Sequence, residues 1–430
     1  MDKRTFLRYT SQNIAGMIGL SCYILIDTLF VSLALGTSGL AALNLAITVF
    51  SVVSSVGQLL GVGGGTDFAL RKGEGHDTTA CLHTALRIGG MAALTFAVTG
   101  LFFARPLSIL LGANDATLEL TEVYVRVTLL FSPVFILNAI LQGFVRNDGA
   151  PKLAMLSMLV SSGTNIVLDY LFMFPLHMGM FGAVLATGVS ACLSTPVLLA
   201  HFLSPRCSIR LTAMRHNLQK TLRMLSYGLS ALIGELASAV SLLTFNLLLM
   251  HMSGHTGVAA YGVIANTALV ATAIFTGLGQ GIQPLFSQAF GASDHTAVHQ
   301  LLSYTKASVI ALSLLVFSLV FLFAQPIASA FNHEGSAKLL ELATDGLRIY
   351  FGGHLFAGLN IASTALLSAV CEPARALLIS ALRSCLLLIP AALACSHFFG
   401  VTGVWLSFVF TESVCCALSL VFVAKAKEIA

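Results

Sequence analysis

Charged residues are scarce in this sequence. Only 9% of its 430 residues are Asp, Glu, Lys or Arg, and 57% are hydrophobic, whereas soluble domains contain about 25% charged residues. So little charge cannot cover the surface of a water-soluble protein of this length. The composition therefore excludes an ordinary soluble fold, including a basic nucleic-acid-binding domain, and predicts that lipid surrounds much of the chain.

Motifs for catalysis and for nucleotide binding are missing as well. The sequence has no G-x-x-x-x-G-K-[ST] loop, no H-E-x-x-H or C-x-x-C metal motif, no G-x-S-x-G nucleophile and no D-D-x-x-D run. The glycine-rich segment 61–65 lies within an apolar run, so we interpret it as close helix packing in lipid. These absences argue against an intramembrane enzyme and against transport driven by ATP. They leave an ion gradient, or passive movement, as the driving force.

Long apolar runs are what the chain has instead. A membrane-spanning helix needs about 20 apolar residues, and the runs are separated by glycine, proline or charge. The sequence therefore predicts an all-α membrane protein with twelve transmembrane helices. They cover residues 11–35, 40–70, 82–103, 119–145, 152–174, 181–203, 222–251, 258–290, 298–323, 341–369, 374–398 and 403–424.

The basic residues lie in only some of the connections between these runs. The connections 37–39 and 175–182 contain no Lys or Arg. Because cytoplasmic loops carry an excess of Lys and Arg, we expect both termini in the cytoplasm and a multi-pass protein of the bacterial cytoplasmic (inner) membrane. The basic positions are Lys3, Arg4, Arg8, Arg71, Lys72, Arg206, Arg210, Arg215, Lys220, Arg223, Lys425 and Lys427.

The two halves of the chain resemble each other. Residues 38–43 match residues 256–261, and Asn138 aligns with Asn360 at a similar offset. We therefore predict two pseudo-symmetric lobes of six helices, 1–203 and 222–430, joined by a basic cytoplasmic linker over 204–221. Six is an even number, so the lobes keep the same orientation, and transporters built in this way bind substrate where the repeats meet.

Two carboxylates lie inside the predicted spans. Asp27 and Asp169 are embedded in apolar runs, where a charge costs at least about 2.5–3.5 kcal/mol. Asn165 is one helical turn before Asp169, and Thr187 lies in the next predicted span. Carboxylate, amide and hydroxyl oxygens suit Na⁺, and the same cluster could instead hold a proton. The four residues are therefore a candidate cation-coupling site, and the candidate metal ligands if the ion is sodium.

Two further acids lie within the second half of the predicted spans. Glu235 could attract cations in a central cavity, relay protons or belong to a local hydrogen-bonded network. For Glu412, the local network is the interpretation we favour. Asp67 and Arg71, four residues apart near the end of the second run, predict an ion pair.

At these residues the chain resembles the multidrug and toxic compound extrusion (MATE) transporters, and most of all their bacterial DinF/MepA-type branch. The similarity runs through nearly all of the predicted spans. The segments that carry it are 26–31, 61–64, 146–152, 165–170, 179–187, 257–262 and 281–284. The resemblance implies two six-helix lobes in a V around a central cavity, and a secondary antiporter that exports organic cations against H⁺ or Na⁺.

The resemblance also suggests site residues and departures from the family pattern. The family's cation site falls on Asp27, Asn165, Asp169 and Thr187, and its seventh-helix acid falls on Glu235. Further candidates for the substrate cavity are Tyr170, Asn138, Asn360 and Gln283. Span 6 often carries Gln where this chain has Ala191, helix 1 lacks the proline of some relatives, and span 10 has Asn360 in place of an acid.

The expected partners follow from this interpretation. They are small organic cations and membrane lipid, with no nucleic acid, no cofactor beyond H⁺ or Na⁺, and no obligate protein partner. The alternative is a lipid-linked precursor flippase of the same superfamily. A flippase would favour a cavity rich in Arg for phosphates, but the Arg residues lie mostly in the predicted cytoplasmic loops.

Overall fold

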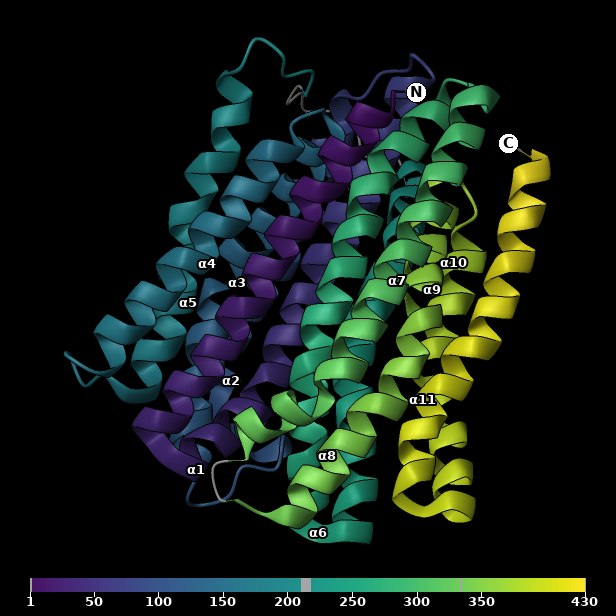
Figure 1. Cartoon of the computed structure of the whole chain (residues 1–430). Coiled ribbons are helices and arrows are strands. Elements are labelled where there is room, and N and C mark those ends of the chain that lie inside the picture. Colours follow the sequence, from purple (N-terminus) through teal and green to yellow (C-terminus); the bar gives the residue numbers. More distant parts are fainter. Residues whose placement is uncertain (1, 210–217, 333–334, 430) are drawn as a thin grey trace. The chain divides into compact units, whose positions relative to one another are not determined.

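The computed structural model describes residues 2–209, 218–332 and 335–429, and every regular element in these ranges is helical. Arg210 and Arg215 of the predicted linker lie outside the described residues. The fold class predicted from the sequence is therefore confirmed. Figure 1 shows the elements, which are α1 (Lys3–Gly73), α2 (Thr79–Leu110), α3 (Leu118–Asn147), α4 (Pro151–Met173), α5 (Gly179–Leu199), η1 (Ala200–Leu203), α6 (Leu218–Gly291), α7 (His295–Phe331), α8 (Ala337–Tyr350), η2 (Phe351–Gly353), α9 (His354–Ala369), α10 (Pro373–Ala381), η3 (Leu382–Leu386) and α11 (Leu388–Ile429).

Three of the long helices are interrupted at a single glycine. Gly36 in α1, Gly254 in α6 and Gly400 in α11 have φ values of 64°, 59° and 62°, a region that glycine enters without steric cost. Eight helices in the described residues are long and apolar enough to cross a membrane. Dividing three of them at these glycines, and adding the interrupted run 337–369, gives the twelve predicted spans.

Two spans predicted as continuous helices contain irregular turns. A 3₁₀ turn at Phe351–Gly353 separates α8 from α9, where two consecutive glycines disfavour an α-helix. A π-helical turn at Leu382–Leu386 separates α10 from α11. This turn contains Arg383, whose side chain binds Glu412. Single π-turns inside helices often occur at functional positions.

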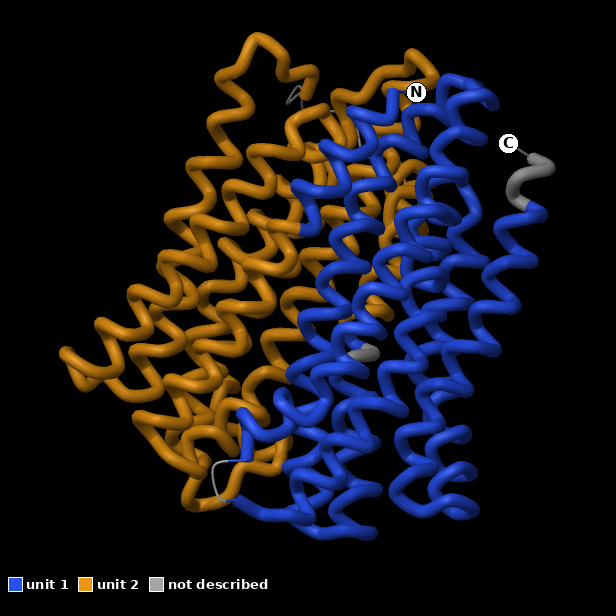
Figure 2. The backbone as a smooth tube through the Cα atoms, in the orientation of Figure 1, with its two compact units in different colours: residues 1–14, 236–430 blue, residues 15–235 orange. Residues whose placement is uncertain are grey.

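The chain forms two compact units, which Figure 2 shows in different colours. Unit 2 comprises residues 15–235, and unit 1 comprises residues 1–14 and 236–430. Phe6 and Tyr9 pack with Leu278 and Ile282, which places the beginning of α1 in unit 1. The first turns of α6, in contrast, belong to unit 2. The boundaries of these units differ from those of the predicted lobes, 1–203 and 222–430. The division into two six-helix lobes therefore stays a prediction.

Glycine allows close helix packing inside unit 2. A Cβ atom added to Gly143 would lie 2.1 Å from the carbonyl oxygen of Gly61, and one added to Gly228 would lie 2.0 Å from that of Leu59. Any side chain at these positions would separate the helices. The glycine-rich segment 61–65 therefore serves helix packing, as the sequence suggests, and small residues commonly do so in membrane proteins.

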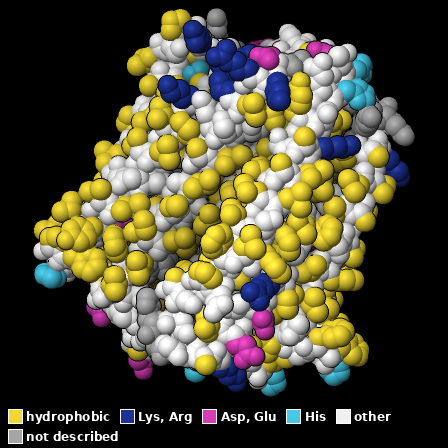
Figure 3. Space-filling view, viewed as in Figure 1, with side chains coloured by type: hydrophobic (Ala, Val, Ile, Leu, Met, Phe, Trp, Pro, Cys, Tyr) yellow, Lys and Arg dark blue, Asp and Glu magenta, His cyan; other side chains and the backbone are white. Residues whose placement is uncertain are grey.

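Large hydrophobic side chains are exposed on both units. Phe102 and Leu110 of unit 2 are 71% and 82% exposed, and Leu322 and Phe398 of unit 1 are 71% and 77% exposed. Figure 3 shows hydrophobic side chains spread over the visible face. A water-soluble monomer rarely exposes so much apolar surface. Together with the apolar helices, it identifies a multi-pass membrane protein.

Candidate functional site

Asp27 and Asp169 meet inside unit 2. Asp27 lies on α1 and is 7% exposed, and Asp169 lies on α4 and is fully buried. Their carboxyl groups are hydrogen-bonded to each other, and Oδ1 of each has no hydrogen-bond partner. Two carboxylates this close in a water-poor site repel each other unless a proton or a cation lies between them. Two residues that are 142 positions apart in sequence thus form one site.

Asn165 and Thr187 complete this cluster. The Asn165 amide and the Thr187 hydroxyl are 3.3 Å apart. With its oxygen toward Thr187, the Asn165 side chain donates through nitrogen to Oδ2 of Asp169 at 2.9 Å. Helices α1, α4 and α5 therefore bring together the four predicted residues, which we call the Asp27/Asp169 site. Their part in ion coupling stays a prediction.

Two tyrosines near this site were not found from the sequence. Tyr23 and the buried Tyr124 are close enough to interact electrostatically with both carboxyl groups. Tyr23 lies one helical turn before Asp27, so the four-residue spacing could have indicated it. Tyr124 lies on α3 and carries no comparable signal. A phenol can donate a hydrogen bond to a carboxylate, so both residues can stabilise the ionised form of the two carboxyl groups.

Glu235 also belongs to unit 2. Its carboxyl group is hydrogen-bonded to Ser54 of α1, and it interacts electrostatically with Tyr23. The hydroxyl of Ser54 is a neutral partner and leaves the acid without a compensating cation there. Cation attraction, proton relay and a local network, the three interpretations from the sequence, all stay open for Glu235.

The other predicted cavity residues have different surroundings. Tyr170 is 54% exposed and packs against Phe30 and Phe174, with ring centres 6.3 Å and 5.5 Å away. Asn138 is buried, and its amide donates to the carbonyl of Ala191 at 2.7 Å, which holds α3 against α5. Gln283 is buried in unit 1. A role of these residues in substrate binding stays a prediction.

A second buried polar cluster lies in unit 1. Arg383 donates to Glu412 through Nη2 at 2.8 Å and through Nε at 2.9 Å. Asn360 donates to Oε2 of Glu412 at 2.7 Å and accepts from Ser419 at 2.9 Å. The local network expected for Glu412 is confirmed. The sequence analysis did not single out Arg383, although an arginine within an apolar span close to an acid in the next span is a usable signal.

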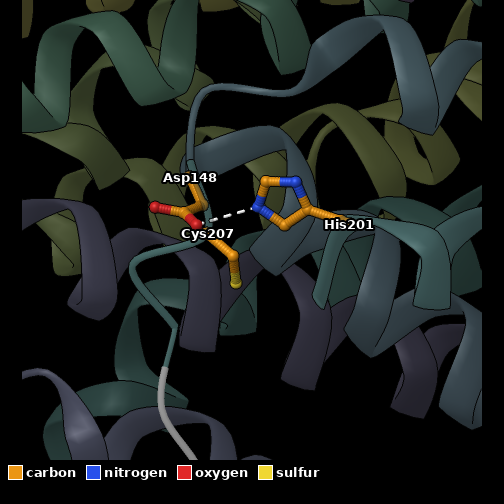
Figure 4. Close-up of side chains that lie close together, drawn as sticks. All are labelled: Asp148, His201 and Cys207. Carbon is orange, nitrogen blue, oxygen red and sulfur yellow. Dashed lines mark hydrogen bonds and ion pairs between the residues drawn. The ribbon is translucent and has the colours of Figure 1, made fainter. Parts of the chain in front are cut away.

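Asp148, at the end of α3, is the centre of a third cluster. Its carboxylate accepts from Lys72 at 2.6 Å and from the backbone N–H of Ser208 at 2.8 Å, and it lies 2.8 Å from Nε2 of His201. Burial by itself would raise the pKa of Asp148, but these hydrogen bonds outweigh it and hold the pKa well below its usual range. Figure 4 shows that Cys207 lies beside Asp148 and His201. Sequence reasoning missed this cluster because its members are far apart along the chain.

The predicted ion pair of Asp67 and Arg71 is also present. Nε of Arg71 lies 2.8 Å from Oδ2 of Asp67, one turn away on α1. Both side chains are largely buried, and Arg223 of α6 approaches the other carboxylate oxygen at 3.5 Å. The pair therefore helps to hold α6 against the end of α1.

Several curated proteins resemble this chain over most of its length. "Multidrug export protein MepA" of Staphylococcus aureus (strain NCTC 8325 / PS 47) is 26% identical over 405 residues, which are 93% of this chain and 89% of that protein. The protein of the same name from Staphylococcus saprophyticus is 25% identical over the same share of each chain. The likeness thus extends over both units.

Solved structures share the fold. A MOP superfamily transporter from Pyrococcus furiosus, described as having a binding pocket of reverse polarity, is 22% identical with a TM-score of 0.92. An outward-facing multidrug resistance MATE family transporter is 22% identical with a TM-score of 0.90. Each match covers 99% of this chain and 96% of the other. The predicted MATE fold is therefore confirmed.

A family profile agrees with these relatives. The MatE profile matches residues 14–171 and 231–393, well over half of the sequence. The two matched segments fall in the two halves of the chain, as the internal repeat requires. The profile, the curated relatives and the shared fold all describe transporters and not enzymes. The chain belongs to the MatE family.

Proposed function

We propose that this chain is a multidrug antiporter. It exports organic, mostly cationic amphiphilic compounds in exchange for H⁺ or Na⁺ that enters the cell. The relatives named as multidrug export proteins support the cargo class. The observation that carries the coupling is the Asp27/Asp169 site, in which two buried carboxyl groups meet without a compensating side-chain cation in the described residues.

Binding of a cation would change the energy of this site. A proton or Na⁺ between Asp27 and Asp169 neutralises charge that is costly inside a membrane. Asn165 and Thr187 add neutral oxygen ligands, which suit Na⁺. The ion draws the carboxylate of α1 toward the carboxylate of α4 and the hydroxyl of α5, and its release allows α1 to move away. An ion shifts an equilibrium between two arrangements only if it binds one of them more tightly, and an arrangement that brings Asp27 to Asp169 meets this requirement.

Export then follows by alternating access. In the outward-facing state the cation enters, neutralises Asp27 and Asp169 and drives release of the drug. The cation leaves toward the cytoplasm, and the freed carboxylates favour recapture of another cationic drug from that side. Glu235 adds negative charge near Tyr23 that would attract such cargo. We place both termini in the cytoplasm and the chain in the bacterial cytoplasmic membrane, because the basic connections indicate this orientation.

The alternative of a lipid-linked precursor flippase has less support. Such cargo carries phosphate groups, and its recognition favours arginine. Arg383 lies in an interrupted span, but its guanidinium is paired with the Glu412 carboxylate and is therefore not free to bind phosphate. The uncompensated buried charge described above is negative. It therefore favours a cationic cargo over a phosphorylated one.

Ethidium efflux from cells tests the proposal. Wild type is compared with Asp169→Asn in the presence and absence of Na⁺ and with an uncoupler, and Asp115→Asn, at an exposed acid, is the matched control. We expect efflux by wild type and the control, loss of efflux in Asp169→Asn, and a Na⁺ or uncoupler effect that names the ion. Unchanged efflux in Asp169→Asn would contradict the coupling role, and absence of efflux in wild type would favour the flippase.

A further inference from the structure

Asp148, His201 and Cys207 form a compact group at one end of unit 2, which we call the Asp148 cluster. Each offers one possible metal ligand, and the three ligand atoms lie within 4.8 Å of one another. Asp148 follows the last turn of α3, His201 lies in η1, and Cys207 lies in the segment after η1. These positions are outside the Asp27/Asp169 site, and the proposed transport cycle does not use them.

The donor atoms of the Asp148 cluster select a particular kind of ion. A thiolate sulfur, an imidazole nitrogen and a carboxylate oxygen are the ligands of Zn²⁺ in proteins. Na⁺, Mg²⁺ and Ca²⁺ prefer oxygen ligands alone and do not favour a cysteine thiolate as a ligand. Three protein ligands leave the fourth tetrahedral position of zinc for water. The chemistry of the cluster therefore fits zinc better than the ions of the transport cycle.

The surroundings of the Asp148 cluster resemble the outer partners of a metal site. The side chains of Asp148 and His201 are 0% and 3% exposed. Lys72 and the hydroxyl of Ser208 both donate to Oδ1 of Asp148, while Oδ2 accepts from the backbone N–H of Ser208 and faces His201. Ligating carboxylates in proteins are usually held by such additional hydrogen bonds. Lys72 and the Ser208 hydroxyl hold Oδ1, and a metal at Oδ2 would share that oxygen with the backbone N–H of Ser208.

Only small movements separate the present geometry from a zinc site. Ligand atoms of tetrahedral zinc are about 3.3–3.6 Å apart, given bond lengths of about 2.0–2.3 Å. Nε2 of His201 and Oδ2 of Asp148 are 2.8 Å apart and would separate slightly. Sγ of Cys207, now 3.6 Å from the carbonyl oxygen of Ile209, would turn toward them. A zinc ion would replace the hydrogen bond between His201 and Asp148 by two metal bonds.

We propose that the Asp148 cluster binds one zinc ion through Asp148, His201 and Cys207. The ion ties the segment after η1 to the end of α3 and, through Lys72, to α1. A ligand that binds the folded state stabilises it in proportion to its concentration. Zinc therefore raises the thermal stability of the protein and restrains residues 204–209 after η1. The cytoplasmic side, to which we assign this end, is reducing and keeps the Cys207 thiol available.

Zinc binding by the purified protein tests this proposal without any transport assay. The full chain is prepared in detergent with a tag free of His and Cys, stripped with a chelator and titrated with Zn²⁺ against a chromophoric competitor. Co²⁺ serves as a second probe, because thiolate-to-cobalt absorption reports bonding to a cysteine. We expect one zinc ion per chain, a cobalt–thiolate band, and an increase in melting temperature with zinc.

Matched variants separate this site from adventitious binding. Cys207→Ser and His201→Gln are expected to weaken zinc binding by at least about tenfold, and Cys207→Ser to abolish the cobalt–thiolate band. Cys192→Ser and His177→Gln, at exposed positions, serve as controls that leave binding unchanged. Cys207 is partly exposed, so its variant avoids the folding risk of changing Asp148. Equal zinc affinity of wild type and Cys207→Ser, or no zinc bound by wild type, would overturn the proposal.

Discussion

The acids buried within the membrane-spanning helices of the two units are compensated in different ways. In unit 1, Glu412 is 2% exposed, is neutralised by Arg383, which donates three hydrogen bonds to it, and accepts a further one on Oε2 from Asn360. In unit 2, Asp27 and Asp169 contact each other, and each keeps one oxygen without a partner. A buried carboxylate paired with arginine needs no external ion. A carboxylate without such a partner is best compensated by an ion that binds and dissociates, so this comparison supports our proposal that ion coupling takes place in unit 2.

This difference breaks the symmetry expected from the repeat. The second half repeats sequence features of the first, but its polar centre contains its own cation, Arg383. Asn360, which aligns with Asn138, contacts Glu412 and Ser419, while Asn138 joins α3 to α5. Both asparagines fasten helices together. The two aligned amides therefore both serve packing, but only Asn360 contacts an acid.

The largest expected effect is on the pair in unit 1. Arg383→Ala leaves Glu412 buried without its cation, and breaking a buried ion pair in this way costs about 3–5 kcal/mol. We expect a strong fall in the yield and melting temperature of the purified protein. The double variant Arg383→Met, Glu412→Met removes both charges and should restore most of the stability. Equal loss in the single and double variants would show that the pair is not what stabilises unit 1.

The opposite result is expected in unit 2. Asp27→Asn or Asp169→Asn removes a repulsive charge, so the melting temperature should stay equal or rise, while gradient-driven efflux is lost because the ion no longer binds. Efflux and thermal unfolding are measured on the same preparations, with Asp115→Asn as control. A large loss of stability in Asp169→Asn would mean that this acid is structural, like Glu412.

A smaller effect is expected from the neutral ligand Thr187. Thr187→Val keeps the shape but removes the hydroxyl near Asn165, and a hydrogen-bonding group contributes about 0.5–1.5 kcal/mol. This predicts that the cation concentration for half-maximal efflux rises by up to about tenfold. The maximal rate should change little. An unchanged concentration dependence would remove Thr187 from the site.

The smallest effect is expected from Tyr23. Tyr23→Phe keeps the aromatic ring and removes the hydroxyl group that interacts with Asp27 and Asp169. We expect a shift of a few-fold in the cation concentration for half-maximal efflux, since one neutral donor is lost. Tyr227→Phe provides the control for removal of a buried phenolic hydroxyl, because Tyr227 lies in α6 and its hydroxyl accepts from Arg223 at 3.0 Å. A larger effect in Tyr23→Phe than in Asp169→Asn would reverse the assigned roles.

Much of the fold follows from local signals in the sequence. The low charge and long apolar runs predict the spans, and the turns fall at Gly36, Gly254 and Gly400, where only glycine adopts the backbone without strain. The Asp27/Asp169 site is also predictable, because a carboxylate in an apolar run stands out and Asn165 lies one turn from Asp169. These inferences need only composition and helical spacing.

Other features depend on contacts that spacing does not encode. Arg383 reaches Glu412 from a π-helical turn, and no local pattern predicts that turn. The Asp148 cluster joins Asp148 to His201, 53 positions further along the chain, and to Cys207. The assignment of the start of α1 to unit 1 depends on Phe6 and Tyr9 packing with residues of α6. Tertiary packing determines each of these, so sequence reasoning missed them.

Gradient-driven transport in proteoliposomes tests the central claim most directly. An imposed Na⁺ or pH gradient is the only energy source, and movement of ethidium in the opposite direction is recorded. The account predicts transport by wild type and by Arg383→Met, Glu412→Met, and none by Asp27→Asn or Asp169→Asn. Gradient-driven transport that survives in both Asp variants, or that fails only when Arg383 and Glu412 are replaced, would contradict the assignment of coupling to unit 2.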